Sequence, residues 1–302
     1  MVMESVGERI ERLKKERNAI ILVHNYCLPE VQDVADYVGD SLGLSVTATK
    51  TDADVIVFCG VTFMAETAKI LNPSKTVLIP DEAAVCAMAQ MCSPEQIVAA
   101  RANNPGKEVV GYVNSTAACK AEMDVCCTSS NAVDIVSSLD SDGAIFVPDR
   151  NLGNYAAGKC PQKDVLLWHG FCPIHQSISV QQVRELIAAH PGAEVLAHPE
   201  CRSQVLELAD VIGSTEKMLN HCKASDRNEF IVLTEVGMRH RLEVNCPGKS
   251  FYFPESAVCG AMKMATLETV ADVLENMDKR VEVPEDVSVR ARRPVERMIS
   301  HS

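Results

Sequence analysis

Three cysteines recur at a nearly constant interval along this chain of 302 residues. They are Cys86, Cys172 and Cys259, which are 86 and 87 residues apart. Each follows an apolar run and a short turn, and seven residues later comes a serine or threonine. After the first two cysteines, this residue opens a predicted capping box, Ser93–Gln96 and Ser179–Gln182. The recurrence indicates an internal repeat, and three equivalent units predict one shared site on a pseudo-threefold axis.

Thiols in this arrangement allow three interpretations. The cysteines could be small buried residues at equivalent core positions, which is a common place for cysteine. They could bind a structural zinc ion, with His175 as the fourth ligand that such a site needs. We favour a 4Fe–4S cluster held by three thiolates, one from each unit, because this leaves one iron open as a Lewis acid.

A polar tripeptide ends the first apolar run of every unit. Its first position is His24, Tyr112 or His198, and its third position is Tyr26, Asn114 or Glu200. The carboxyl ends of parallel strands form the edge where ligands bind, so these side chains are expected to line one pocket. Glu200 and Tyr26 are candidate proton carriers. The imidazoles of His24 and His198 can orient or protonate a substrate oxygen.

A hydroxyl residue lies fifteen residues beyond the third position of each tripeptide. These residues are Ser41, Ser129 and Thr215, and each comes five residues after an aspartate. A single such hydroxyl would normally be an N-cap that stabilises its helix by about 1 kcal/mol. Three helix N-termini directed at one axis would instead gather N–H donors into an anion-binding cup.

The framework that positions these residues is predicted to be α/β. First strands start near residues 19, 109 and 195, second strands cover 54–59, 143–147 and 230–234, and third strands precede the cysteines. We therefore expect three similar αβα sandwich domains with parallel sheets and pseudo-threefold symmetry around a central site. Their predicted limits are 1–106 with an N-terminal helix, 107–192, and 193–302 with a C-terminal tail from Glu282 that wraps around the body.

Composition limits the functional classes. The net charge of −12 argues against nucleic acid and anionic membranes as partners. No apolar run approaches the roughly 18 residues of a spanning helix, and the charged N-terminus differs from a signal peptide, so we expect a cytoplasmic protein. In that reducing compartment 13 cysteines do not predict disulfides, and there is no C-x-x-C spacing.

Six ordered motifs extend from about residue 19 to residue 275. They are VHNY at Val23–Tyr26, PDEAAVC at Pro80–Cys86, YVNS at Tyr112–Ser115, WHGFCPIH at Trp168–His175, HPEC at His198–Cys201 and FPESAVCG at Phe253–Gly260. In this combination the chain resembles the quinolinate synthase family of prokaryotic NAD biosynthesis. Some bacterial relatives carry a C-terminal C-x-x-C that this chain lacks, so no thiol switch of that kind is expected.

The resemblance implies an enzyme that condenses iminoaspartate (iminosuccinate) with dihydroxyacetone phosphate and releases quinolinate, phosphate and two waters. It implies an oxygen-sensitive 4Fe–4S cluster on the three repeated cysteines, within three αβα domains. It also implies that iminoaspartate is handed over from the enzyme that produces it. The substrate-binding positions that it implies are His24, Ser41, Tyr112, Val113, Asn114, Ser129, His198, Pro199, Glu200 and Thr215.

Two other classes of function use the same residues. A hydro-lyase would apply the open iron to a different hydroxy acid, without triose phosphate. A non-catalytic iron–sulfur sensor would bind the cluster but no small diacid. The three polar tripeptides argue for catalysis, since a sensor has little need of so many polar groups at the metal.

Overall fold

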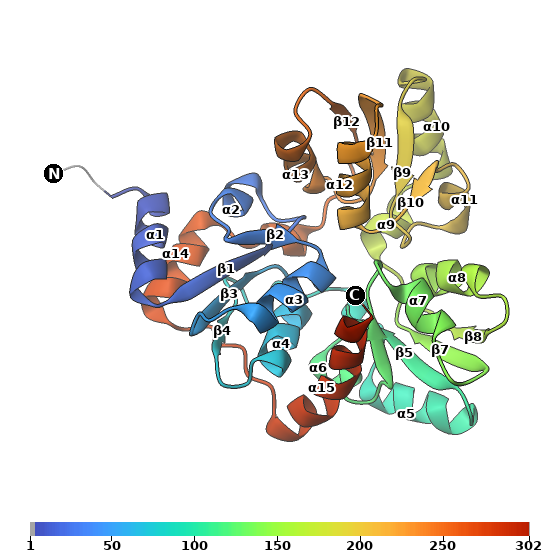
Figure 1. Cartoon of the computed structure of the whole chain (residues 1–302), viewed down its shortest axis with the longest axis horizontal. Coiled ribbons are helices and arrows are strands. Elements are labelled where there is room, and N and C mark those ends of the chain that lie inside the picture. The colour runs from blue at the N-terminus through green and yellow to red at the C-terminus, as the bar shows by residue number, and fades with distance from the viewer. Residues whose placement is uncertain (1–3, 302) are drawn as a thin grey trace.

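The computed structural model describes residues 4–301, so Met1–Met3 of the N-terminal segment and Ser302 of the tail lie outside it. Within this range three four-stranded parallel sheets surround the centre of a flat molecule (Figure 1). We call each sheet with its helices a unit. The strands, in spatial order, are β2 (Tyr37–Gly39), β1 (Ala19–His24), β3 (Val55–Cys59) and β4 (Thr76–Leu78) in the first unit; β6 (Val125–Cys127), β5 (Glu108–Tyr112), β7 (Gly143–Val147) and β8 (Asp164–Leu167) in the second; and β10 (Val211–Ile212), β9 (Glu194–Ala197), β11 (Glu229–Leu233) and β12 (Ser250–Tyr252) in the third. The predicted fold class is confirmed.

Each repeated aspartate lies immediately before a short edge strand, β2, β6 or β10, and bonds to the backbone of the first strand in its unit. The Oδ2 atom of Asp36 accepts a hydrogen bond from the backbone N–H of Ile21 in β1, at 2.8 Å. Asp124 and Asp210 make the equivalent bonds to the first strands of their units, also at 2.8 Å. Each carboxylate therefore satisfies a strand N–H just before the edge strand begins its ladder.

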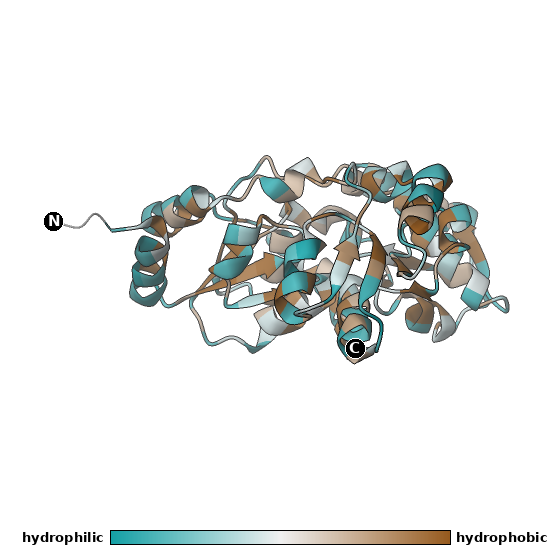
Figure 2. Cartoon of the chain, turned by 90° about the horizontal axis from the view of Figure 1, so that it is seen from above, coloured by the Kyte–Doolittle hydropathy of each residue, from teal (hydrophilic) through white to brown (hydrophobic). Residues whose placement is uncertain are grey.

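Helices pack on both faces of each sheet, and Figure 2 shows apolar strands between helices with hydrophilic outer surfaces. They are α1 (Val6–Glu16), α2 (Pro29–Asp33), α3 (Ser41–Lys50), α4 (Thr62–Leu71), η1 (Met88–Gln90), α5 (Pro94–Asn103), α6 (Ala117–Lys120), α7 (Ala132–Ser137), α8 (Arg150–Lys159), α9 (Pro173–Ser177), α10 (Val180–Ala189), α11 (Ser203–Leu206), α12 (Thr215–Ala224), α13 (Met238–Asn245), η2 (Gly260–Lys263), α14 (Leu267–Asn276) and α15 (Glu285–Ser300). The two predicted capping boxes are present at the starts of α5 and α10. A third, formed by Thr266 and Thr269, starts α14. Among the described helices, none is both long and apolar enough to cross a membrane.

The helix that begins eight residues after each repeated cysteine packs on the next sheet. Helix α5 contacts β5, and α10 contacts β11. The last of the three, α14, returns to the first unit, where it lies beside α1 and contacts β3 (Figure 1). Val270 and Leu274 of α14 share a buried cluster with Ile10 of α1 and Val57 of β3. The three units are thereby closed into a ring, while the division of the chain near residues 106 and 192 stays a prediction.

The C-terminal helix α15 lies across two units. It contacts β6 and α6 of the second unit and α3 and α4 of the first. Ala291, Val295 and Met298 are fully buried in these contacts. This is the wrapping that the sequence predicts for the tail.

Candidate active site

The three repeated cysteines line one cavity of about 320 Å³ at the centre of the ring. Cys86 lies just before η1, Cys172 is the residue before α9, and Cys259 is the residue before η2. All three are partly exposed, whereas the ten other cysteines of the chain are buried. Most of the remaining lining is apolar, with Val61 and Phe63 from the start of α4 among its members. We refer to this space as the cysteine cavity.

A small polar pocket of about 40 Å³ adjoins the cysteine cavity. All three units contribute to it, and the residues that line it are His24, Tyr26, Asp40, Ser41, Met64, Tyr112, Asn114, Thr128, Ser129, His198, Glu200, Thr215 and Met262. The third residues of the tripeptides, Tyr26, Asn114 and Glu200, line both spaces. The first residues line the polar pocket together with the three repeated hydroxyls. The tripeptides therefore form the boundary between a thiol-lined chamber and a polar one.

Val113 and Pro199 differ from the other expected substrate-binding residues. Both are buried, and neither is among the residues that line the two spaces in the described part of the chain. The backbone N–H of Val113 donates to Cys127 of the edge strand. A role for either residue in binding substrate stays a prediction.

The repeated hydroxyls lie at helix starts but are not the caps. The N-caps are Asp40 for α3 and Ser214 for α12, one residue before Ser41 and Thr215. Helix α7 begins after Asn131, two residues beyond Ser129, and the Asn131 side chain makes no capping hydrogen bond. The capping oxygens of α3 and α12 thus come from the preceding residues, which leaves the hydroxyls of Ser41 and Ser129 for other partners. The hydroxyl of Thr215 accepts a hydrogen bond from Asn25 Nδ2 at 2.8 Å.

Glu200 is held between two histidines. Its Oε2 lies 2.9 Å from His175 Nδ1 and 3.2 Å from His198 Nδ1. Burial opposes ionisation of this carboxyl, but the two histidines outweigh it and hold its pKa below the ordinary value. Its other oxygen, Oε1, is buried without a hydrogen-bond partner in the described structure. Glu200 therefore presents a carboxylate oxygen with free accepting capacity at the boundary of the two spaces.

Tyr26 is connected to Glu200 by a buried chain of hydrogen bonds. The Tyr26 hydroxyl lies 2.6 Å from Thr234 Oγ1, which lies 2.9 Å from His175 Nε2. The other nitrogen of His175 contacts Glu200 and also lies 3.2 Å from Cys172 Sγ. Burial first, and then the charge of Glu200, raise the pKa of Tyr26 well above its ordinary value. The two candidate proton carriers thus lie at the ends of one network, with the tyrosine protonated and the glutamate ionised.

The imidazoles at the tripeptides are held neutral. Burial, with smaller contributions from His198 and Lys263, lowers the pKa of His24 to about 3. Burial also lowers the pKa of His198, although Glu200 acts in the opposite direction. Two neutral imidazoles in the polar pocket can donate or accept hydrogen bonds without adding charge.

Two sets of side chains in the site could hold a metal. The first is the three cysteines of the cavity. Burial raises the pKa of Cys86 to about 12, and it raises the pKa of Cys172 and of Cys259 as well, so a bound cation is what would ionise them. The second is Cys172, His175 and Glu200, whose ligand atoms lie within 4.8 Å of one another.

Comparison with known proteins identifies the family. The model of the family described as quinolinate synthetase A protein matches residues 8–300. The chain belongs to this family. Proteins named quinolinate synthase are similar over almost their whole length: that of Methanoregula boonei is 51% identical over 294 residues, covering 97% of each chain, and that of Pyrococcus furiosus is 51% identical over 303 residues, covering 99% of each. The one from Aquifex aeolicus is 45% identical over 306 residues, covering 99% of this chain and 95% of its own. This protein is accordingly an enzyme of the quinolinate synthase family.

The sequence does not predict several of the residues that form the site of this quinolinate synthase family member. Thr234 directly follows β11, and Asp40, Thr128 and Met64 line the polar pocket. The sequence indicates His175 only as a possible zinc ligand, whereas in the structure it bridges Thr234 and Glu200. The only sequence signal for these residues is their place at strand ends and helix starts, which many structural residues share.

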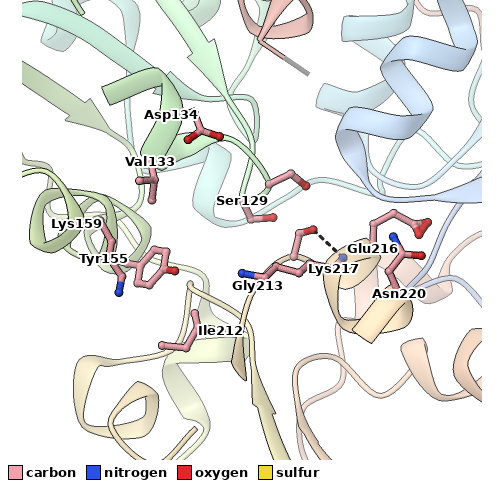
Figure 3. Close-up of a pocket in the computed structure, with 12 residues that line it drawn as sticks. Ser129, Val133, Asp134, Tyr155, Lys159, Ile212, Gly213, Glu216, Lys217 and Asn220 are labelled. Atoms are coloured by element: carbon pink, nitrogen blue, oxygen red, sulfur yellow. Dashed lines mark hydrogen bonds between the residues drawn. The ribbon is translucent and has the colours of Figure 1, made fainter. Parts of the chain in front are cut away.

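The polar pocket approaches the surface between the second and third units. Ser129 lines both this pocket and an outer cavity of about 540 Å³. Figure 3 shows Tyr155 and Lys159 of α8 on one side of the outer cavity and Gly213 and Lys217 on the other. The outer cavity therefore adjoins the polar pocket at Ser129.

Proposed function

We propose that this protein condenses iminoaspartate with dihydroxyacetone phosphate to form quinolinate, phosphate and two waters. One observation carries the proposal: three thiols from three units line a cavity whose boundary residues also line a polar pocket. A dehydrating condensation needs both an electrophilic centre and groups that move protons. We also propose that iminoaspartate reaches the site directly from the enzyme that makes it.

The residues of the cysteine cavity fit a 4Fe–4S cluster with Cys86, Cys172 and Cys259 as ligands. The thiols are equivalent in the repeat, they are the partly exposed cysteines, and the largely apolar lining limits access of water. A zinc ion on Cys172, His175 and Glu200 would use one of three equivalent thiols and leave the other two without a purpose. When bound, such a cluster supplies Lewis-acid activation at its open iron.

The polar pocket is suited to carboxylate and phosphate groups. Ser41 and Thr215 are the first residues of α3 and α12, whose N-termini carry partial positive charge. The Asn114 Oδ1 atom is buried without a partner in the described residues, so it can accept from a substrate hydroxyl or imine. These groups would orient the two substrates against the boundary residues.

Glu200 and Tyr26 are assigned opposite roles in proton transfer. The carboxylate of Glu200 is ionised at neutral pH and would accept a proton at its unpartnered Oε1. The phenol of Tyr26 is protonated and would donate to a leaving oxygen. The chain through Thr234 and His175 gives the two groups a hydrogen-bonded connection.

The test is an anaerobic assay of the iron-reconstituted protein with both substrates, in which the product is identified by mass. We expect quinolinate, and we expect Cys172→Ala to lose both product and the iron–sulfur absorbance. Cys222→Ala, which changes a buried cysteine of α12 away from the cavity, is the control. An unchanged cluster spectrum and output in Cys172→Ala would refute the ligand assignment. Turnover of a hydroxy acid without triose phosphate would favour a hydro-lyase, and no spectral response to diacids would favour a sensor.

A further inference from the structure

We propose that Glu235 and Lys263 are positioning residues that fix Tyr26 relative to the loop of Cys259. The inference rests on the proposed function, since it assigns these residues an effect on a proton carrier. Glu235 is fully buried and lies two residues after β11. Its Oε1 accepts from the backbone N–H of Cys259 at 2.9 Å, and its Oε2 accepts from the N–H of Gly237 at 2.7 Å. The carboxylate thus fixes the backbone of the cysteine loop.

Lys263 connects this carboxylate to another unit of the ring. Its Nζ lies 3.0 Å from Glu235 Oε1, and it also donates to the backbone carbonyl of Tyr26. One carboxylate and one ammonium group therefore link the backbone of Cys259 in the third unit to the backbone of Tyr26 in the first. Charge-assisted hydrogen bonds of this kind are short and directional, so they set position as well as stability.

Gln32 ties the residues on either side of Tyr26 to the same loop. Its buried amide nitrogen lies 2.9 Å from the carbonyl of Cys27, 3.2 Å from that of Asn25 and 3.2 Å from that of Gly237. Three consecutive carbonyls of the first unit are accordingly held by two side chains. The density of these contacts indicates that the placement of this turn is tightly specified.

Gly237 leaves the space that this contact needs. A Cβ atom at this position would lie 2.5 Å from Lys263 Nζ, 2.6 Å from the carbonyl oxygen of Tyr26 and 2.8 Å from Glu235 Oε2. All three distances are shorter than a carbon atom tolerates. An alanine at 237 would separate the three partners while leaving every hydrogen-bonding group in the chain.

The second unit repeats the construction for the other proton carrier. Asp149, two residues after β7, accepts from the N–H groups of Cys172 at 3.3 Å and Asn151 at 2.7 Å. Asn151 Nδ2 then donates to the carbonyl of Glu200 in the third unit at 2.9 Å. In the first unit the corresponding residue is Val61, which has no oxygen to offer. An acidic residue two positions after the second strand is thus present in the second and third units. The unit next to the second carries Glu200, and the unit next to the third carries Tyr26, the two proposed proton carriers.

The first test compares Lys263→Met with Lys249→Met. Lys249 is a matched control because it belongs to the same unit, is partly buried and donates to two carbonyls, of Cys222 and Ser225, away from both spaces of the site. We expect Lys263→Met to lower kcat by about 10–100-fold with little change in KM, because a displacement near 1 Å has this effect on a reacting group. We expect Lys249→Met to keep the parent kcat. Equal kcat values in the two variants would overturn the inference and leave the proposed function intact.

A double-mutant cycle with Tyr26→Phe separates positioning from a general loss of structure. If Lys263 acts through the phenol, Lys263→Met has no further effect on kcat once the phenol is absent. Additive losses would overturn the inference. Full activity of Tyr26→Phe would refute the proton-transfer role of Tyr26 in the proposed function. If Lys263→Met lost activity while Tyr26→Phe kept it, Lys263 could not act through the phenol, and the inference would be overturned as well.

Amide hydrogen exchange of the full-length protein gives a readout that is independent of turnover. Residues 24–27 and 258–262 are expected to exchange faster together in Lys263→Met, and at the parent rate in Lys249→Met. Gly237→Ala should accelerate the same two segments and show the same kcat loss, and it serves in place of Lys263→Met if that variant does not fold. Parent-like exchange in both segments, in whichever of the two variants folds, would overturn the inference.

Discussion

Replacing Glu200 with glutamine tests the proposed proton transfer most directly. Glutamine keeps the size of the side chain and one acceptor oxygen for His175 or His198, which lie 2.9 and 3.2 Å from Oε2. It cannot accept a proton at the position of the unpartnered Oε1. General acid–base catalysis contributes about 10²–10⁴-fold, so we expect kcat to fall by this factor, which corresponds to about 3–5 kcal/mol in the barrier.

The change in stability should be smaller and should depend on pH. Because the folded-state pKa of Glu200 lies below the ordinary value of 4.5, its ionisation stabilises the folded parent above that pH. This stabilisation is absent from Glu200→Gln, and in the parent it disappears as the pH falls through the lowered pKa. The expected loss near neutral pH is about 1–3 kcal/mol, which denaturant unfolding measures.

The matched control for this variant is Glu194→Gln. Glu194 is also in the third unit, and its Oε2 lies 2.9 Å from His221 Nε2, outside both spaces of the site. We expect Glu194→Gln to keep the parent kcat, and we expect both Glu194→Gln and Glu200→Gln to keep the same iron–sulfur absorbance. A near-normal kcat in Glu200→Gln, with the absorbance intact, would remove Glu200 from the chemistry.

Three further predictions address the ring, the polar pocket and the buried imidazole. Leu274→Ala should lower the free energy of unfolding by about 2–5 kcal/mol in urea, because this fully buried residue packs helix α14 against the first unit. Val289→Ala, at a residue 68% exposed on α15, should have little effect, and equal values would contradict the packing. Thr215→Val should raise KM about tenfold with a smaller change in kcat, because it removes one hydrogen-bonding hydroxyl from the polar pocket; an unchanged KM would exclude that contact. Burial lowers the folded-state pKa of His24 from 6.5 to about 3, so protonation of this imidazole favours the unfolded chain. The stability that the neutral imidazole contributes is therefore present above pH 6.5 and is lost as the pH falls toward 3. His24→Gln should make the free energy of unfolding less dependent on pH in this range, and an unchanged dependence would argue against a neutral buried imidazole.

The central strands and the positions of the tripeptides at their ends could be predicted because each leaves a local signal. Runs such as residues 55–59 are continuously apolar and are followed by a turn residue, which is typical of a strand buried on both faces. Tyr26 and Glu200 could be assigned to one site because the repeat placed them at equivalent strand ends. The edge strand β10, by contrast, has two residues, too few for any hydropathy period.

Contacts between units could not be predicted in the same way. The packing of α14 on β3 of the first sheet joins segments about 210 residues apart, and an amphipathic helix does not specify which sheet covers its apolar face. Asp149 and Glu235 are acidic residues after a strand, and such residues are usually solvated. Their burial against the N–H groups of Cys172 and Cys259 is visible only in three dimensions.

The three units carry equivalent residue types at the cysteine and hydroxyl positions and different residue types at the boundary between the two spaces. Each unit supplies a cysteine to the cavity and a hydroxyl to the polar pocket. At the boundary between the two spaces, however, the same position is Tyr26 in one unit, Asn114 in the next and Glu200 in the third. In the proposed reaction these three residues would serve as a proton donor, a neutral hydrogen-bonding group and a proton acceptor around one axis. A gene-triplicated scaffold with three identical residues there would place three like groups at this boundary and could not both donate and accept a proton. The divergence at these three positions is therefore the feature that would give catalytic activity to an otherwise symmetric metal-binding site.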